Sequence, residues 1–297
     1  MRAFLIRSFL HLSAQLPLAI SHRLALLIGW LLTIIPNDIR RITRINLQLC
    51  FPDMDATERG RLEHNSLTEM VKTGLELGPM WLWSQQRSLA LIKQIHGQSL
   101  LEQAIKQGNG VILAVPHLGM WELLGLYVSS HHAMTSLYRP PRLAALNNIM
   151  RSGRERFGAR LVPTSTRGIR DLYRALAQGE LVAILPDQEP RWGNGVFSPF
   201  FGLPAYTATL LPRIAEKSGA TILMAYAIRR PSGEGFDLHF REVNDGCYSN
   251  DLTQAATALN REIEQCVRAR PEQYQWHYRR FRTRPENDPA SYYRQKK

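Results

Sequence analysis

The amino-acid sequence predicts an α/β fold in which a mainly parallel central sheet is covered by helices on both faces. Short apolar runs rich in β-branched residues, bounded by glycine or proline, recur along the chain and are typical of buried strands. Segments with helical spacing of apolar residues separate these runs, and strands that alternate with helices favour parallel pairing. A hydrophobic content of 44% in 297 residues supplies enough apolar side chains for such a core.

The first 45 residues are hydrophobic and basic, and we expect them to form a membrane-anchoring helix. The uninterrupted apolar run 24–35 is shorter than the roughly 20 residues that cross a bilayer. Counting from Leu16 supplies the length but places Arg23 inside the segment. Three arginines within residues 40–44 follow, and basic residues beside an apolar segment stay cytoplasmic and attract anionic lipid. The segment therefore fits a spanning anchor, an interfacial anchor or a buried helix hairpin.

The remainder of the chain divides into helical and extended segments. Residues 55–107 have helical spacing, with a break at Gly78-Pro79 and a dense apolar patch from Met80 to Trp83 that fits either a core or a bilayer interface. The predicted strands are 111–115, 135–138, 181–185, 221–228 and 236–240. The predicted helices after the first of these strands are 121–129, 147–157, 168–178, 207–217 and 251–267.

His117 follows the first predicted strand, at the turn where that strand meets a helix. In open α/β sheets, ligands bind beyond the carboxyl ends of the strands, where such turns lie. Glu122 is five residues further on, and on one continuous helix the two side chains would point about 140° apart. They meet only if the turn, which Pro116 and Gly119 permit, folds back over Glu122. The pair would then be a general base with an orienting carboxylate, although the spacing fits equally a turn histidine beside a solvated glutamate.

Charge and cysteine content narrow the kind of partner. The chain has 37 Lys and Arg against 25 Asp and Glu, a formal net charge of +12, which attracts anionic membranes, acidic proteins or nucleic acid. The charge comes with no recognisable nucleic-acid-binding motif, so we expect no nucleic-acid partner. The three cysteines are scattered and odd in number, so they predict neither a disulfide framework nor a zinc site, and we expect no metal.

The string His117-Leu-Gly-Met-Trp-Glu122 resembles the His-x4-Asp/Glu motif of the glycerolipid and lysophospholipid acyltransferase superfamily. The wider chain resembles more narrowly the late (secondary) acyltransferases of lipid A biosynthesis, of the lauroyl and myristoyl transferase type. The pieces that carry this resemblance are residues 44–53, the His117 motif, Tyr138-Arg-Pro140, Leu185-Pro-Asp-Gln188, residues 196–202 and residues 271–281. One departure is Met120, where the family often has asparagine.

The resemblance implies an acyltransferase of the bacterial inner membrane, with residues 1–45 as the anchor and residues 46–297 as a catalytic domain on the cytoplasmic side. It implies that His117 takes the proton of an acceptor hydroxyl that attacks an acyl thioester, while Glu122 orients His117. The acceptor would be a hydroxyacylated, phosphorylated lipid A precursor. We expect acyl carrier protein rather than coenzyme A as the donor, because that carrier is acidic and this chain is basic, and we expect no bound cofactor.

Polar residues at two further strand ends are candidates for substrate binding. Arg139 ends the strand 135–138 and is the first choice for a phosphate clamp, with Arg151 and Arg154 as second choices. Asp187 matches a position where the superfamily often has a motif that contacts the acceptor, and it otherwise fits a turn cap. It would serve acceptor binding or shape the site.

Two other functions stay open at this point. Another lipid acceptor, such as a lysophospholipid, an aminolipid or a glycolipid, would keep the same chemistry. A non-catalytic membrane-binding protein of the same fold would keep its effect after His117→Ala. For the enzyme, we expect His117→Ala and Glu122→Ala to abolish transfer while folding stays near normal.

Overall fold

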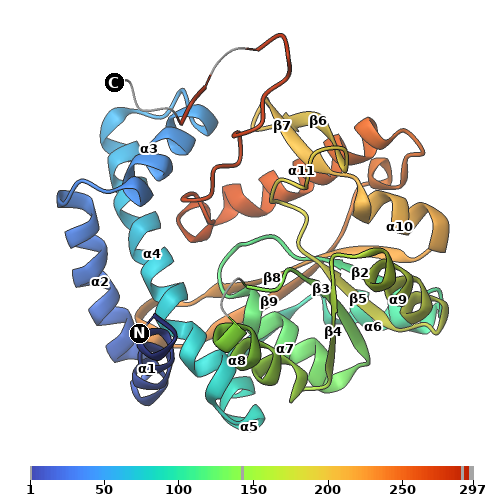
Figure 1. The fold of residues 1–297 in the computed structure, drawn as a ribbon, viewed down its shortest axis with the longest axis horizontal. Coiled ribbons are helices and arrows are strands. Elements are labelled where there is room, and N and C mark those ends of the chain that lie inside the picture. Colours follow the sequence, from blue (N-terminus) through green and yellow to red (C-terminus); the bar gives the residue numbers. More distant parts are fainter. Residues whose placement is uncertain (1, 142–143, 289–290, 294–297) are drawn as a thin grey trace.

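A seven-stranded sheet lies at the centre of the computed structural model, which describes residues 2–141, 144–288 and 291–293 (Figure 1). The strands are β1 (Ile92–His96), β2 (Val111–Ala114), β3 (Met134–Tyr138), β4 (Ala159–Pro163), β5 (Leu181–Ile184), β8 (Thr221–Arg229) and β9 (Phe236–Glu242). Their order across the sheet is β1-β9-β8-β2-β5-β3-β4. The pair β8–β9 is antiparallel and the other pairs of this sheet are parallel, which confirms the predicted mainly parallel α/β sheet.

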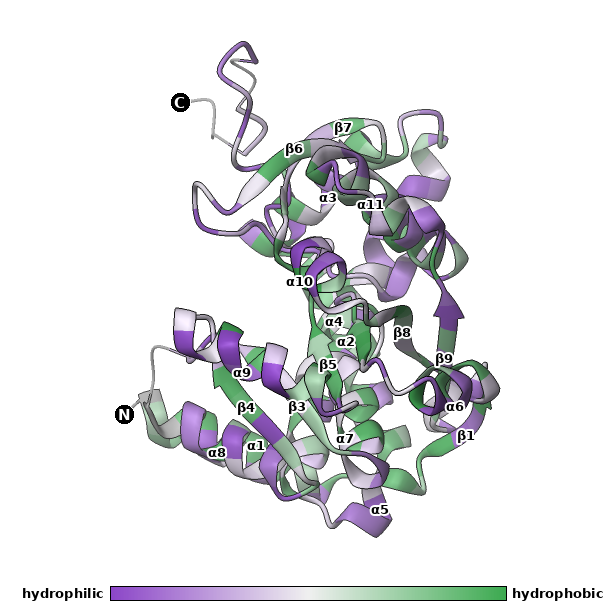
Figure 2. Cartoon of the chain, turned by 90° about the vertical axis from the view of Figure 1, so that its right-hand side faces the viewer, coloured by the Kyte–Doolittle hydropathy of each residue, from purple (hydrophilic) through white to green (hydrophobic). Residues whose placement is uncertain are grey.

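Helices cover both faces of the sheet because successive side chains of a strand point to opposite sides. Val111 and Leu113 of β2 pack with α6 and α7 on one face, whereas Ile112 and Ala114 pack with α9, α10 and α11 on the other. These helices are α6 (Gln98–Lys106), α7 (Trp121–His131), α9 (Thr166–Ala177), α10 (Leu210–Ser218) and α11 (Leu252–Ala269). Figure 2 shows hydrophilic residues on the outer turns of helices such as α9 and apolar strands between the helical layers.

Four N-terminal helices form a layer beside the sheet, on the left of Figure 1. They are α1 (Arg2–Gln15), α2 (Leu18–Ile34), α3 (Asp38–Cys50) and α4 (Ala56–Leu82). Glycines allow close packing: a Cβ on Gly29 would lie 2.8 Å from Cα of Thr68, and one on Gly78 would lie 2.3 Å from the carbonyl oxygen of Leu10. The helices α1 and α2 therefore pack directly against α4.

The membrane-anchoring segment expected from the sequence corresponds to these helices. Among the described residues, no single helix is both long and apolar enough to cross a bilayer, while α2 and α3 together, bent by 82°, satisfy length and composition. Large apolar side chains stay exposed on α1 and α2, among them Phe4, Leu5, Leu12, Leu27 and Trp30.

A buried ionic cluster joins α2, α4 and β8. Arg229 of β8 donates to Glu76 and Glu69 of α4, and Glu76 also accepts from the ring of His22 on α2, with 2.7 Å between the His22 Nε2 and Glu76 Oε1 atoms. The side chains of Arg229, Glu76 and His22 are all almost fully buried. Burial alone would raise the pKa of Glu76, but the Arg229 charge holds that pKa below its ordinary value. The N-terminal helices are thus tied to the sheet by charge as well as by apolar contact.

Several expected elements were wrong or missed. The strand β4 and the hairpin of β6 (Gly195–Phe200) and β7 (Leu203–Ala208) had no prediction, and α8 (Ala144–Glu155) begins earlier than expected. The helix α5 (Gln85–Leu89) lies within the stretch that was predicted as helical. The edge strand β1 lies inside the stretch predicted as helical because its exposed polar residues give it no strong apolar pattern. The hairpin contains two prolines and turns at Phe201 and Gly202, both with positive φ.

The Gly78-Pro79 break predicted within the helical stretch is also wrong. Pro79 lies in the last turn of α4, where the helix continues to Leu82. Proline removes one donor from the helix, and near a helix end the loss affects only the final turn. The patch that follows is core rather than bilayer interface, because Met80, Trp81 and Trp83 are buried.

Candidate active site

The candidate site lies at the carboxyl ends of two neighbouring parallel strands. The last paired residues of β2 and β5 are Ala114 and Ile184. A proline follows within two residues of each strand end, and the next residue is His117 after β2 and Asp187 after β5. Parallel neighbours end at the same edge of a sheet, so the two side chains meet there although 70 residues separate them.

His117 and Asp187 are joined by two hydrogen bonds. The Nδ1 atom of His117 lies 2.7 Å from Asp187 Oδ1, and the backbone N–H of His117 donates to Asp187 Oδ2 over 2.8 Å. Asp187 is 2% exposed; burial would raise the pKa of its carboxyl, but the His117 ring and the hydrogen bonds hold that pKa below its ordinary value. The ionised carboxylate accepts a hydrogen bond from the N–H at Nδ1, so that Nε2 is the nitrogen with the free lone pair whenever the ring is uncharged.

The turn that carries His117 is fixed by the backbone of distant segments. Gly119 has φ of +62°, and a Cβ there would lie 1.9 Å from the carbonyl oxygen of Ala227, so glycine is required. The N–H of Gly119 donates to the carbonyl of Gln273, and the N–H of Gln275 donates to the carbonyl of His117. Together with the bond from the N–H of Met120 to the carbonyl of Ala227 in β8, these bonds hold the histidine turn in place.

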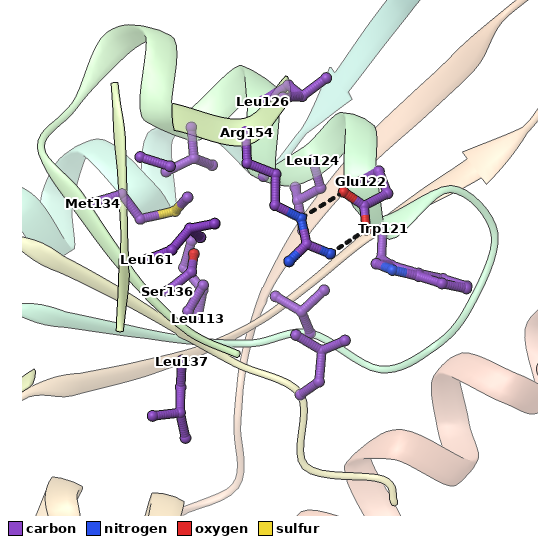
Figure 3. A pocket seen from close by; sticks show the side chains of 16 residues that line it. Leu113, Trp121, Glu122, Leu124, Leu126, Met134, Ser136, Leu137, Arg154 and Leu161 are labelled. Carbon is purple, nitrogen blue, oxygen red and sulfur yellow. Dashed lines mark hydrogen bonds and ion pairs between the residues drawn. The ribbon is translucent and has the colours of Figure 1, made fainter. Parts of the chain in front are cut away.

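Glu122 does not bind His117 in this structure, which corrects the contact expected from the sequence. The side chain of Glu122 accepts from Trp81 Nε1 over 3.0 Å and from Arg154 Nε over 2.8 Å, and a second Arg154 nitrogen binds the other carboxylate oxygen. Figure 3 shows this pair beside Trp121. The turn at Gly119 does not fold back over Glu122, because Glu122 enters α7 and points toward α4 and α8. Asp187 therefore occupies the orienting position.

Two cavities adjoin the site. The larger, about 460 Å³, lies between α1, α2, α4 and the His117 turn, and Phe9, Ile28, Met70, Gly74 and His117 are among its lining residues. The smaller, about 60 Å³, is a narrow apolar slot between α7 and the sheet that begins at the Glu122–Arg154 pair (Figure 3). Trp121 lines both cavities. The larger cavity offers apolar volume beside the His117 side chain.

The C-terminal segment adds two residues of the stretch 271–281 to the site, although neither was an individual candidate from the sequence. Gln275 and His277 line the larger cavity together with His117. Burial, and then the proximity of the His117 charge, lower the pKa of His277 to about 4, so this ring is neutral at neutral pH. Gln188, the residue after Asp187, places its amide nitrogen 3.2 Å from His117 Nε2 and 3.0 Å from Gln275 Oε1. Gln188, Gln275 and His117 lie side by side because residues 273–275 pair with the His117 turn. No local sequence pattern predicts that pairing.

The three candidate phosphate-binding arginines differ in their surroundings. Arg139 is exposed beyond β3, and within the part of the chain that the structure describes its side chain has no hydrogen-bond or ionic partner. Arg151 contacts the Tyr138 hydroxyl and Glu155, and Arg154 is engaged with Glu122. Arg139 is thus the arginine whose donors stay available. As for metals, the described ranges contain no group of three or more His, Cys, Asp or Glu side chains placed to hold an ion.

A histidine bonded to a buried carboxylate, beside a large apolar cavity, is typical of an enzyme that uses a general base on a lipid-like substrate. Comparison with known proteins narrows that class. The family described as bacterial lipid A biosynthesis acyltransferase matches residues 1–283. The chain belongs to this family, and it is an acyltransferase.

Individual relatives align with this chain over most of their length. A lipid A biosynthesis lauroyltransferase of Escherichia coli (strain K12) is 28% identical over 95% of this chain and 92% of its own. A lipid A biosynthesis palmitoleoyltransferase of the same strain is 30% identical over 84% of this chain and 81% of its own. A lipid A biosynthesis myristoyltransferase, also from that strain, is 25% identical over 86% of this chain and 79% of its own. These names differ in the acyl chain, so likeness at this level does not select one chain length.

Proposed function

We propose that this acyltransferase moves a fatty acyl chain from acyl carrier protein to a hydroxyl of a hydroxyacylated, phosphorylated lipid A precursor. The observation that carries the proposal is the His117–Asp187 pair beside a cavity of about 460 Å³. The family and its lauroyl-, palmitoleoyl- and myristoyltransferases support lipid A as the acceptor class. The same chemistry on another lipid acceptor is the competing outcome of the assay below.

The reaction needs a base and a position for the acceptor, since a thioester is already activated. His117 Nε2 takes the proton of the acceptor hydroxyl as its oxygen attacks the thioester carbonyl carbon. The C–S bond then breaks, the new ester remains on the acceptor, and the imidazolium returns the proton to the departing thiolate. Asp187 stabilises the imidazolium through the Nδ1 hydrogen bond. General-base catalysis of this kind contributes roughly 10²–10⁴-fold to the rate.

Glu122 acts in this account as a positioning residue. Its carboxylate holds Arg154 and Trp81, and the adjacent Trp121 ring lies edge-on to His117 with 5.0 Å between the ring centroids. Loss of the carboxylate would free the first turn of α7 and shift Trp121. The effect of Glu122 on transfer then passes through the packing around His117.

The cavity beside His117 would take an acyl chain, and basic residues would bind the acceptor phosphate and attract the acidic donor. Gly74 faces the cavity from α4, and a Cβ on it would meet no atom within 4 Å, so this position opens directly into the cavity. The exposed Arg139 is the first choice for a phosphate of the acceptor, with Arg151 and Arg154 second because other side chains engage them. The net charge of +12 would attract an acidic acyl carrier protein, which we propose as the donor in preference to coenzyme A.

We also propose that α1 and α2 lie in the cytoplasmic interface of the bacterial inner membrane. Exposed apolar residues on both helices would enter the lipid, and the arginines that follow α2 would attract anionic headgroups. The cluster of His22, Glu76 and Arg229 argues for an interfacial arrangement, because buried charges that tie α2 to the sheet would not favour the hydrocarbon core. Residues 1–45 would then be a membrane anchor that is packed against the catalytic domain.

The test is transfer from acyl carrier protein to a phosphorylated, hydroxyacylated lipid A precursor, with mass spectrometry as readout. Membranes would contain the intact protein, His117→Ala, or no recombinant protein. A mass gain of one acyl chain that requires His117 supports the proposal. Gain only on a lysophospholipid, aminolipid or glycolipid offered in parallel would replace the acceptor. Gain that persists in His117→Ala would remove the proposed base.

A further inference from the structure

The side chain of Gln188 covers the nitrogen that the reaction needs. Its amide nitrogen lies 3.2 Å from His117 Nε2 and 3.0 Å from Gln275 Oε1. The orientation of the amide follows from chemistry: Asp187 accepts a hydrogen bond from the N–H at His117 Nδ1, so Nε2 of the uncharged ring carries a lone pair and accepts. The Gln275 oxygen also accepts, so the group between them has to be the NH₂ end of Gln188, which has two N–H donors.

We propose that Gln188 is a catalytic residue that caps the base in the free enzyme and then donates its released N–H to the oxyanion of the tetrahedral intermediate. The inference rests on the proposed function and names a further group for the same reaction. Gln275 holds the second N–H throughout the cycle, which makes it a positioning residue for Gln188.

The position of the Gln188 N–H relative to the oxyanion follows from the atoms that have to meet at His117 Nε2. The acceptor hydroxyl can give its proton to His117 only by taking the place of the Gln188 N–H at the lone pair. That hydroxyl oxygen bonds to the thioester carbon, so the oxyanion forms two bonds away from it. The displaced N–H stays beside the same point because the other N–H is held by Gln275. A donor held near the place where charge develops has its greatest effect in the transition state.

Gln275 is itself well anchored. Its backbone N–H donates to the carbonyl oxygen of His117 over 3.2 Å, so the base, the amide and its support belong to one hydrogen-bonded unit. The other titratable groups near His117 keep the oxyanion position free of a competing charge. Asp187 faces Nδ1 on the far side of the ring, and Tyr274 packs against Asp187 with its hydroxyl pKa raised by burial and by that carboxylate. His277 is neutral, because burial and then the His117 charge lower its pKa to about 4.

The test compares Gln188→Ala, Gln188→Glu and Gln275→Leu with wild type in steady-state transfer assays on the full chain in detergent micelles. Gln188→Ala should lower kcat by about 10²–10³-fold, the usual loss for one oxyanion donor. The KM for the acceptor should stay the same or fall, because the hydroxyl no longer displaces an amide. Gln275→Leu should lower kcat less, since the donor remains but is less restrained. The exposed Gln86 provides a matched control, and Gln86→Ala should leave kcat and KM unchanged.

Gln188→Glu gives a readout that a structural role would not move. A carboxylate next to His117 Nε2 stabilises the imidazolium, so the acid limb of the kcat/KM profile should move upward by about 1 pH unit or more. The proposal is overturned if Gln188→Ala keeps kcat within threefold of wild type, if its kcat falls only together with its thermal midpoint, or if the Gln188→Glu profile is unshifted. His117→Ala, measured alongside, distinguishes failure of this inference from failure of the proposed function. If His117→Ala is inactive and Gln188→Ala is fully active, Gln188 is not the oxyanion donor but His117 can still be the base.

Discussion

Removal of the Glu122 carboxylate should destabilise the fold as well as lower transfer. Glu122 is 5% exposed and receives hydrogen bonds from Arg154 and Trp81. Glu122→Ala leaves the Arg154 guanidinium without its counter-charge and the Trp81 N–H without its acceptor. Breaking a buried ion pair by removing one partner costs about 3–5 kcal/mol, and since the Arg154 side chain keeps 24% exposure, we expect a loss of about 3 kcal/mol. This changes the expectation from sequence that folding stays near normal.

Urea unfolding of the full chain in detergent micelles, followed by tryptophan fluorescence, measures that loss. Glu155→Ala is the matched control, because Glu155 forms an exposed pair with Arg151 on the same face of α8, and it should change stability by no more than about 0.5 kcal/mol. The double variant Glu122→Leu/Arg154→Leu removes both charges and should recover much of the lost stability without restoring full transfer. The reasoning is refuted if Glu122→Ala loses less than about 1 kcal/mol, the scale of an exposed pair, while transfer is abolished, since Glu122 would then act directly in the chemistry.

Three further predictions use other parts of the structure. Gly74→Phe places a ring in the larger cavity and should abolish transfer because the ring occupies the space for the acyl chain. The thermal midpoint should hold or rise, because glycine weakens a helix interior. Transfer of the usual chain at the wild-type rate would contradict an acyl site in this cavity. Arg139→Ala should raise the KM for a phosphorylated acceptor and leave a dephosphorylated one unaffected, and an unchanged KM for the phosphorylated substrate would remove the phosphate assignment. His277→Gln should flatten the pH dependence of unfolding. The folded-state pKa of His277, about 4, lies below the ordinary 6.5, so the unfolded chain takes up the proton first and stability is lost as pH falls from 6.5 to about 4. The loss due to this group is about 3 kcal/mol in urea unfolding, and equal slopes for variant and wild type would count against the low pKa.

The sheet and the position of His117 could be predicted from sequence because both depend on local signals. The apolar run Val111–Ala114, closed by a proline, predicts a buried strand, and the helix that begins at Trp121 places His117 in the turn between them. Apolar runs also identified β5 and β8, whereas β3 and β9, which were predicted as strands too, contain polar residues. Such runs exist because parallel strands are buried on both faces. The edge strand β1 and the hairpin β6–β7 lack that burial on both faces, and their sequences do not stand out.

The hydrogen-bond partner of His117 could not be predicted from spacing within one segment. Glu122 lies close to His117 in sequence, but its direction is set by Arg154 of α8 and Trp81 of α4, which meet only in the folded chain. Asp187 was recognised as a site residue, although its contact with His117 was not. A usable signal was present: His117 and Asp187 each follow a proline just beyond a buried strand, and adjacent parallel strands bring such positions together.

Asp187→Asn is the most direct test of the account, because it changes one atom of the pair. The backbone N–H of His117 needs the acceptor that Oδ2 now supplies, so the asparagine oxygen should keep that bond and turn its NH₂ toward Nδ1. Nδ1 then has to accept, the ring proton moves to Nε2, and the base is lost. We predict that kcat falls by about 10⁴-fold with the fold intact, the loss seen when the same change is made in a serine-protease triad. The account is contradicted if Asp187→Asn keeps near wild-type kcat while Glu122→Gln, equally well folded, is inactive.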